Sequence, residues 1–465
     1  MTGPVRVSLI SLGCPKNLVD SEVLLGHAAQ QGLLIAQDPA DADVAVVNTC
    51  GFIEDARAES IATIREVLRL KTEGGLRGVV VVGCMSERYG DDLRRDIPDV
   101  DAILGLSDYS RVPALIKHIA RGGDDRFVND ARGGNLKGHT ADVARLVLTP
   151  RSYAYLRVGE GCDQVCTFCA IPSIRGRQRS KPIEILVEEA RGLASGGVKE
   201  LILVAEDSTA FGMDWPGRQR RLADLLEALS GVDGIEWIRV LYVYPHTVSS
   251  RITEQLRENP KVVPYIDIPI QHIAAPMLKA MKRGVSSEQV RGILDRLRDE
   301  VPGVAVRSTF IVGFPGESDR DFEELLQLTA DYKFERLGVF SYSEEEGTPA
   351  ADLDAQRVPH AVVRERIAAI MELSRSNIEA RNADLVGRRL QVLVDGHVAP
   401  GSGAPESVRS VGRTFADAPD IDCRVWLDQE LPSATLLEAE IVGQDGYDLT
   451  ARVAGNGSVS ANAGT

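Results

Sequence analysis

Cys162-Asp-Gln-Val-Cys166-Thr-Phe-Cys169 places three cysteines within eight residues, directly after a predicted strand at 153–158. Three thiolates on one loop can hold three irons of a four-iron cluster. The fourth iron is then open to a chelating ligand that supplies an amino and a carboxylate group. A structural zinc site would instead use four protein ligands. The spacing therefore predicts an iron-sulfur cluster with one open iron, and a zinc knuckle or buried structural cysteines are the alternatives.

The region around this loop, from Tyr153 to about Leu373, alternates short β-rich runs with amphipathic helical segments. Such alternation predicts strands joined by helices. Six βα units indicate a barrel or partial barrel of the TIM type, in which the chemistry lies at the carboxyl ends of the strands. The predicted strands are Tyr153–Val158, Leu201–Val204, Trp237–Tyr242, Tyr265–Ile268, Ala305–Val312 and Arg336–Tyr342.

Cysteines also follow the predicted strands of the N-terminal region, where β-rich runs alternate with helical segments and predict an open parallel sheet. These runs are Val5–Ile10, Val44–Val47 and Val79–Val82. Cys14, Cys50 and Cys84 come four, three and two residues after them. The carboxyl ends of neighbouring parallel strands line a common crevice, so we expect the three thiols to meet. They could hold a second cluster whose open iron takes a sulfur ligand; buried structural cysteines are the alternative.

After Arg381 the helical pattern gives way to short strands with an Asp445-Gly446 turn, which predicts a small all-β barrel. The expected fold class is α/β and multidomain, with an open parallel-sheet N-terminal domain, a partial (β/α) TIM-like barrel and a small C-terminal OB-like barrel. A Gly-rich polar segment is a predicted linker and the last residues are a predicted disordered tail. The predicted boundaries are 1–120, 121–145 for the linker, 146–378, 379–455, and 456–465 for the tail.

Composition excludes several classes of protein. Seven cysteines, an odd number without a secretory signal, argue against a disulfide framework and favour metal or redox chemistry. No apolar run approaches the roughly 20 residues that span a bilayer, and residues 1–12 contain no convincing signal-peptide cleavage site. We therefore place the protein in the cytoplasm. Its net charge of −15, from 53 basic and 68 acidic residues, gives no overall attraction to a phosphate backbone.

Four segments around the cysteines carry a family resemblance. They are S-L-G-C-P-K-N-L-V-D-S-E at 11–22, N-T-C-G-F-I-E-D-A-R-A-E-S at 48–60, G-C-M-S-E-R-Y at 83–89 and E-G-C-D-Q-V-C-T-F-C-A-I-P-S-I-R-G-R-Q-R-S at 160–180. Together they resemble the methylthiotransferases of the radical S-adenosylmethionine (SAM) superfamily. Within that family they are most similar to the branch that modifies an aspartate of ribosomal protein uS12. The match covers about residues 5–455.

The resemblance implies an N-terminal methylthiotransferase domain, a radical SAM barrel and a C-terminal TRAM barrel that engages the substrate. It also implies two [4Fe-4S] clusters. Their ligands would be Cys162, Cys166 and Cys169 for the radical cluster, and Cys14, Cys50 and Cys84 for the auxiliary cluster. One SAM molecule would methylate a sulfur associated with the auxiliary cluster, and another would give the 5′-deoxyadenosyl radical that takes hydrogen from the aspartate β-carbon. An electron donor such as flavodoxin or ferredoxin would reduce the clusters.

Residues at strand ends are expected to bind SAM. Glu206 and Asp207 follow the predicted strand at 201–204, where carboxylates could accept hydrogen bonds from the SAM ammonium. Gly313 and Gly316 follow a later strand and would allow close backbone approach to the nucleoside. Phe168, the aromatic residue of the cysteine motif, completes this set. A solvated acid and ordinary turn glycines are the alternative interpretations.

Two positions depart from the family pattern. Glu206 stands where an amide is expected, so the polar contacts to SAM could differ. Cys423 stands where Gly is more usual, has no partner at metal-ligand spacing, and is interpreted as a structural residue of the C-terminal barrel. Among the seven scattered histidines, only His272 follows a predicted strand close to the inferred site.

Two features favour a protein substrate over RNA. Residues 13–17 and 50–54 resemble the aspartate-modifying branch rather than the sister branch that modifies an adenosine in tRNA. Residues 384–452 hold six Arg and no Lys against twelve Asp and Glu, a net charge of −6. This barrel should repel a phosphate backbone and attract basic uS12, unless the excess is only a solvated acidic surface. We expect a monomer without a direct nucleic-acid substrate; tRNA modification and a non-catalytic iron-sulfur or zinc scaffold are the alternative functions.

Overall fold

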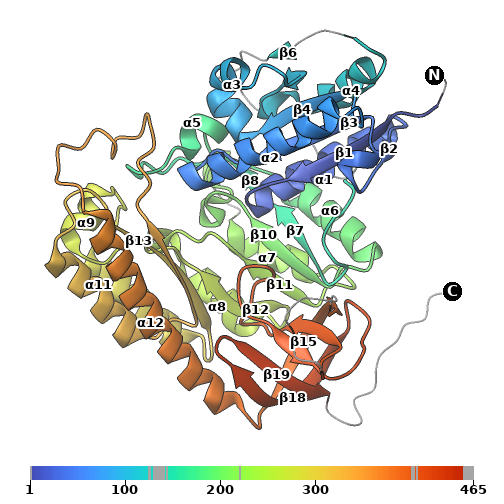
Figure 1. The fold of residues 1–465 in the computed structure, drawn as a ribbon. Helices are drawn as coiled ribbons and strands as arrows, with labels where there is room; N and C mark the ends of the chain where they lie inside the picture. Colours follow the sequence, from blue (N-terminus) through green and yellow to red (C-terminus); the bar gives the residue numbers. More distant parts are fainter. Residues whose placement is uncertain are drawn as a thin grey trace.

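The computed structural model describes residues 3–123, 127–128, 142, 145–218, 221–398, 404 and 407–453. These residues form an N-terminal α/β domain (blue), a central barrel-like sheet with its helices (green to orange) and a small C-terminal β-barrel (red), as Figure 1 shows. The predicted linker at 121–145 falls largely outside the described residues, and the predicted tail at 456–465 does so entirely. In the described part of the chain no helix is long and apolar enough to cross a membrane.

The N-terminal sheet is parallel and has helices on both faces. Alternate residues of each strand point to opposite faces, and two apolar cores result. Val44 and Val46 pack with α1 and α4, whereas Ala45 and Val47 pack with α2 and α3. The strand order is β2 (Leu34–Ile35), β1 (Arg6–Ser11), β3 (Val44–Thr49), β4 (Gly78–Gly83), β5 (Ala102–Ile103), β6 (Phe127–Val128). The helices are α1 (Pro15–Gln30), α2 (Glu54–Thr72), α3 (Cys84–Asp96) and α4 (Val112–Ala120).

The central sheet is also parallel and stays open between its edge strands β7 and β14, so it is a partial barrel. Its strands confirm the predicted strands: β7 (Tyr153–Arg157), β10 (Glu200–Val204), β11 (Trp237–Val240), β12 (Val262–Asp267), β13 (Ala305–Val312) and β14 (Arg336–Ser341). A small hairpin of β8 (Gly159–Glu160) and β9 (Arg179–Ser180) flanks the cysteine loop. The helices are α5 (Ile171–Arg175), α6 (Ile183–Ser195), α7 (Leu222–Ser230), α8 (Ser250–Glu258), α9 (Ala275–Ala280), α10 (Ser287–Glu300), α11 (Asp319–Tyr332) and α12 (His360–Leu385).

The C-terminal strands close into a barrel, as the sequence predicts. Their order is β15 (Arg389–His397), β16 (Ser410–Arg413), β17 (Val425–Leu427), β19 (Asp448–Val453), β18 (Leu436–Asp445). The predicted turn joins β18 to β19, and Gly446 adopts the positive φ of +59° that favours glycine there. Figure 1 shows the long helix α12 running along the central sheet down to this barrel.

Acidic residues of the C-terminal barrel form its contact with the central sheet. Asp417 accepts a hydrogen bond from Nε of Arg336 at 2.9 Å, and Asp422 pairs with Arg307 at 3.3 Å. Asp420 accepts from the hydroxyl of Tyr153. Some of the acidic residues counted in the sequence are therefore paired with other residues inside the molecule. The net charge of −6 is therefore weaker support for a basic partner than the sequence alone indicates.

Candidate functional site

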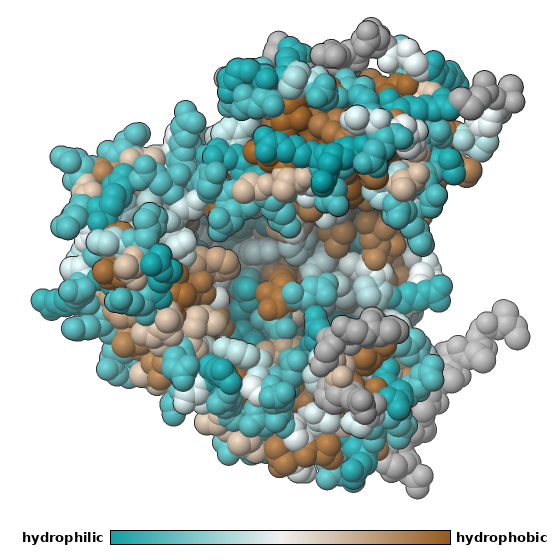
Figure 2. All heavy atoms as spheres, viewed as in Figure 1, coloured by the Kyte–Doolittle hydropathy of each residue, from teal (hydrophilic) through white to brown (hydrophobic). Residues whose placement is uncertain are grey.

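Both groups of cysteines line one cavity of about 430 Å³ between the N-terminal domain and the central sheet. Figure 2 shows the molecule hollowed between these two parts. The loops that line it follow the carboxyl ends of strands in both parallel sheets, where α/β folds bind their ligands. The cysteines brought to this cavity are Cys14, Cys50, Cys84, Cys162, Cys166 and Cys169.

The N-terminal cysteines follow β1, β3 and β4. Cys14 is the N-cap residue of α1, Cys50 follows β3 directly, and Cys84 is the first residue of α3. Their segments are closely packed: a Cβ built on Gly13 would lie 2.7 Å from the Cβ of Cys50, and Gly13 has a φ of +87°. Only glycine fits this position. The sharp turn at Gly13 therefore lets Cys14 and Cys50 share one wall of the cavity.

The other three cysteines lie on the loop between β8 and α5. The Sγ atom of Cys162 accepts a hydrogen bond from the backbone N–H of Gln164 at 3.4 Å. Arg283 donates from Nη1 to Sγ of Cys166 at 3.3 Å. Donors of this kind stabilise a thiolate, which is the form that binds metal.

Burial raises the thiol pKa of Cys84 and Cys162 to about 12 and that of Cys169 to about 11. At neutral pH these thiols are protonated unless a metal replaces the proton. Metal binding at this site must therefore release protons.

The thiols suit an iron-sulfur cluster better than a single ion. All six line the same cavity, and in the described part of the chain no three His, Cys, Asp or Glu side chains converge on one metal-ion position. Zinc needs four ligands at about 2.0–2.3 Å from one point. A four-iron cluster instead takes each cysteine on a different iron. Two sets of three soft thiolate donors therefore fit two clusters, each with one iron left for another ligand.

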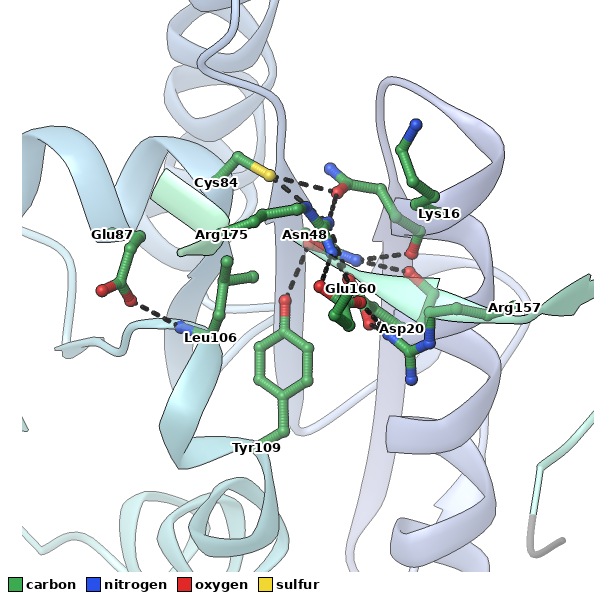
Figure 3. Close-up of polar contacts among 12 residues, drawn as sticks. Lys16, Asp20, Asn48, Cys84, Glu87, Leu106, Tyr109, Arg157, Glu160 and Arg175 are labelled. Carbon is green, nitrogen blue, oxygen red and sulfur yellow. Dashed lines mark hydrogen bonds and ion pairs between the residues drawn. The ribbon is translucent and has the colours of Figure 1, made fainter. Parts of the chain in front are cut away.

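A buried network of charged groups lies beside Cys84 (Figure 3). Arg175 of α5 is 1% exposed. It donates from Nη2 to Asp20 of α1 at 2.9 Å and from Nη1 to Glu160 at 3.0 Å. The same Nη2 lies 2.7 Å from Oδ1 of Asn17 and 3.4 Å from Sγ of Cys84. Arg175 thus joins the two domains and contacts one of the cysteines.

Replacing Arg175 by methionine is expected to lower the free energy of unfolding by about 3–5 kcal/mol, because the buried carboxylates of Asp20 and Glu160 lose a cationic partner. Urea unfolding of the metal-free protein measures the change. Arg177→Met is the matched control, since its side chain is 87% exposed and pairs with Asp163 at the surface; it should cost less than about 1 kcal/mol. Equal unfolding midpoints for the two variants would contradict a structural role for the network.

Of the residues predicted to bind SAM, some line the cavity and others do not. Phe168 and Glu206 line the cavity. The Glu206 side chain is 3% exposed, and neither carboxylate oxygen accepts a hydrogen bond from the described residues. Burial, together with the nearby Glu160, raises its pKa above the ordinary value. A buried carboxylate without a donor suits a ligand that carries an ammonium group.

Asp207, Gly313 and Gly316 are not among the described residues that line the cavity. Asp207 caps a turn, because its Oδ1 accepts from the backbone N–H groups of residues 209 and 210 at 3.1 Å each. A Cβ on Gly313 would lie 2.6 Å from Cγ2 of Val363 in α12. This glycine is therefore required by helix packing.

His272 and Cys423 also lie away from the cavity lining. His272 is fully buried, and its Nδ1 accepts from the backbone N–H groups of Ile273 and Ala274 at 2.9 and 3.1 Å. Burial lowers the pKa of His272 to about 4. The ring is thus neutral and structural at physiological pH. Cys423 is buried just before β17 in the C-terminal barrel.

Several polar residues that line the cavity were not predicted from the sequence. Tyr242 and Gln271 adopt positive φ values of +60° and +72°. Such backbone strain in non-glycine residues often occurs at functional sites. No residue pattern in the sequence predicts it. Lys16 stood in a motif quoted above, where it only marked the branch. The missed polar lining residues are Lys16, Gln164, Arg175, Tyr242, Tyr244, Asp267, Gln271, Arg283, Arg307 and Thr309.

One ion pair connects α3 of the N-terminal domain with the loop that follows β14 of the central sheet. Arg88 of α3 donates to Glu345 at 2.8 Å, and both side chains are less than a tenth exposed. The same Nη1 of Arg88 donates to the carbonyl of Gly51, next to Cys50, at 3.1 Å. Further along the Glu345 loop, the N–H of residue 350 donates to the carbonyl of Thr167 in the other cysteine loop at 2.9 Å. The pair thus helps to set the spacing of the two walls.

Family models match all three parts of the chain. Residues 6–105 match the uncharacterized protein family UPF0004, residues 156–329 the radical SAM superfamily, and residues 386–454 the TRAM domain. Among solved structures, the radical SAM methyltransferase TsrM from Kitasatospora setae superposes with a TM-score of 0.54 at 14% identity, covering 75% of this chain and 77% of that one. That likeness concerns the fold alone.

Curated relatives match over nearly the full length. The ribosomal protein uS12 methylthiotransferase RimO of Trichlorobacter lovleyi is 42% identical over 450 residues, which cover 96% of this chain and 98% of the relative. The RimO of Anaeromyxobacter sp. (strain K) is 44% identical over 456 residues, covering 96% and 93%. With this identity, this coverage and both cysteine groups in place, the chain belongs to the RimO family of radical SAM methylthiotransferases.

Proposed function

We propose that this chain adds a methylthio group to the β-carbon of an aspartate in ribosomal protein uS12. The observation that carries the proposal is the single cavity lined by both cysteine groups in a RimO-family chain. Putting sulfur on an unactivated carbon requires hydrogen removal and sulfur supply at the same place. A cavity with one cysteine group on each side meets that requirement, and the relatives named above act on uS12 according to their names.

Each wall of the cavity has its own task in this proposal. Cys162, Cys166 and Cys169 hold the cluster that binds SAM, and the N-terminal cysteines hold an auxiliary [4Fe-4S] cluster. When bound, the first cluster supplies the electron that cleaves SAM and the second carries the sulfur to be transferred. Glu206 accepts hydrogen bonds from the SAM ammonium, and Phe168 packs against the cofactor. Asp207 supports the site indirectly, because its Oδ2 accepts from Gln164 of the cysteine loop at 2.8 Å.

The proposal includes the molecular setting. The N-terminal (1–120), radical SAM (146–378) and TRAM (379–455) domains supply the auxiliary cluster, the SAM site and a substrate contact respectively. A flavodoxin or ferredoxin supplies electrons. The protein works as a monomer in the cytoplasm, where uS12 and the small ribosomal subunit are found. Gly313 and Gly316 serve the SAM site through the position of the loop after β13.

Deleting the gene is expected to remove a methylthio mass increment from one aspartate of uS12. Mass spectrometry of uS12 from cells with and without the gene measures it, and nucleoside analysis of tRNA from the same cells is done in parallel. Complementation with the unchanged gene should restore the increment, and the Cys50→Ala gene should not. Loss of a methylthio-adenosine from tRNA with uS12 unchanged would assign the chain to the RNA-modifying branch instead.

A further inference from the structure

We propose that Lys16 is the residue that binds the carboxylate of the target aspartate. This inference rests on the proposed function and deepens it, because it names the group that recognises the substrate side chain. Lys16 lies in the first turn of α1, two residues beyond Cys14, and lines the cavity. Figure 3 shows its side chain turned away from the Arg175 network, with no bond to the residues drawn.

The ammonium of Lys16 is held between the two domains. Its Nζ lies 3.5 Å from the carbonyl oxygen of Ala205, at the end of β10. It also lies 4.0 Å from the centroid of the Tyr242 ring, which follows β11. Only 7% of Lys16 is exposed. A carbonyl and an aromatic ring fix the position of the ammonium, but neither supplies a full negative charge.

The arginines of the cavity already have anionic or sulfur partners. Arg175 pairs with Asp20 and Glu160. Arg307 pairs with Asp267 at 2.7 Å and with a second carboxylate from the C-terminal barrel. Arg283 donates to the sulfur of Cys166 and to a backbone carbonyl.

Lys16 differs from Arg175 and Arg307 because it forms no ion pair with any described residue. Arg283 forms no ion pair with a described residue either, but its guanidinium already donates to the sulfur of Cys166. Glu206 is the neighbouring carboxylate, and the cation paired with it is Arg175, with Nε 3.6 Å from its Oε1. A buried ammonium without an anionic partner is costly. An anion that enters the cavity would remove that cost, so Lys16 is the cavity cation that remains for a ligand.

The position of Lys16 suits an aspartate side chain. The carboxylate of aspartate is bonded directly to the β-carbon, so a cation that holds it must lie beside the reacting carbon. That carbon has to reach both walls of the cavity. Lys16 follows Cys14 on one wall, and its contacts Ala205 and Tyr242 belong to the strand ends that face the other cysteines. An adenosine carries no carboxylate, so the same lysine disfavours an RNA substrate.

The test compares uS12 with its form in which the target aspartate is replaced by asparagine, on reconstituted full-length enzyme. Lys16→Met is expected to raise the KM for uS12 by about 10- to 100-fold, the effect of losing a charge-assisted hydrogen bond. The asparagine form serves as a competitive inhibitor. In the unchanged enzyme, the inhibition constant of the asparagine form should exceed the KM for uS12 by a similar factor. In Lys16→Met, the two constants should be about equal.

Two controls separate binding from damage. Lys279→Met changes an exposed lysine of α9 and should leave all constants unchanged. Iron content should be the same in Lys16→Met as in the unchanged enzyme; if iron is lost, Lys16→Gln, which keeps a polar donor, replaces it. An unaltered KM, or an equal weakening of both forms of uS12, would overturn the role of Lys16. Failure of the unchanged enzyme to modify uS12 would instead overturn the proposed function.

Discussion

Replacing Cys166 by alanine is expected to lower the rate at which the dithionite-reduced protein converts SAM to 5′-deoxyadenosine by at least about a thousandfold. In the proposed function, three cysteines on the loop hold the cluster and leave one iron free for SAM, and two cysteines would not secure it. Cys166 is also the cysteine whose sulfur contacts Arg283 and lies 3.6 Å from the hydroxyl of Tyr244. Anaerobic reconstitution followed by chromatography of 5′-deoxyadenosine measures the rate.

The matched control is the same substitution at Cys423. That thiol is buried, as are those of Cys50 and Cys84, but it lies in the C-terminal barrel, outside the cavity lining. Cys423→Ala should cleave SAM at the unchanged rate and bind the same amount of iron. A Cys166→Ala protein that cleaved SAM normally would remove this cysteine from the cluster and favour the scaffold alternative.

The main elements of the fold could be predicted because apolar runs and strands coincide. Val79–Val82 lies within β4, which is buried over its whole length. In the central sheet, each of the six strands likewise overlaps a run that the sequence predicts as a strand. β2 and β5 were missed because two residues are too few to show a period. β16 (Ser410–Arg413) was missed as well, since a strand of four residues with a glycine in it has little pattern.

Convergence of the cysteines was predictable for a topological reason. In parallel sheets, residues that directly follow the strands meet at one edge, and this brought Cys14, Cys50 and Cys84 to one cavity. The direction of each side chain is a different matter. Glu206 faces the cavity and the adjacent Asp207 turns into a cap, which depends on the local backbone and not on distance from the strand.

Long-range polar contacts were not predictable from the sequence. Arg175 lies 155 residues from Asp20, and Arg88 lies 257 residues from Glu345. Each pair forms only because the two domains are docked together, and a single sequence does not contain that information. A different contact, between the C-terminal barrel and the central sheet, pairs Asp417 and Asp422 with arginines, which is why net charge alone was a poor guide to the outer surface of that barrel.

Replacing Cys50 by alanine is expected to separate the two reactions of the cavity. SAM cleavage should continue, because the other cysteine loop keeps its three thiols, while methylthio transfer to uS12 should fall by at least about a hundredfold. Bound iron should fall by about half, since one of the two proposed clusters would be lost. The measurements are iron content, 5′-deoxyadenosine and the mass of uS12 from the same anaerobic reaction.

The contrast between the two cysteine variants is more informative than either loss alone. Cys50 belongs to the N-terminal wall, and the carbonyl of Gly51 that binds Arg88 is backbone, so Cys50→Ala leaves the link between the walls in place. Loss of transfer with SAM cleavage retained therefore indicates a missing sulfur source and not a displaced domain. Parallel loss of both reactions would mean that the walls depend on each other for folding. Normal transfer would make Cys50 a structural residue, and the sulfur would have to come from elsewhere in the site.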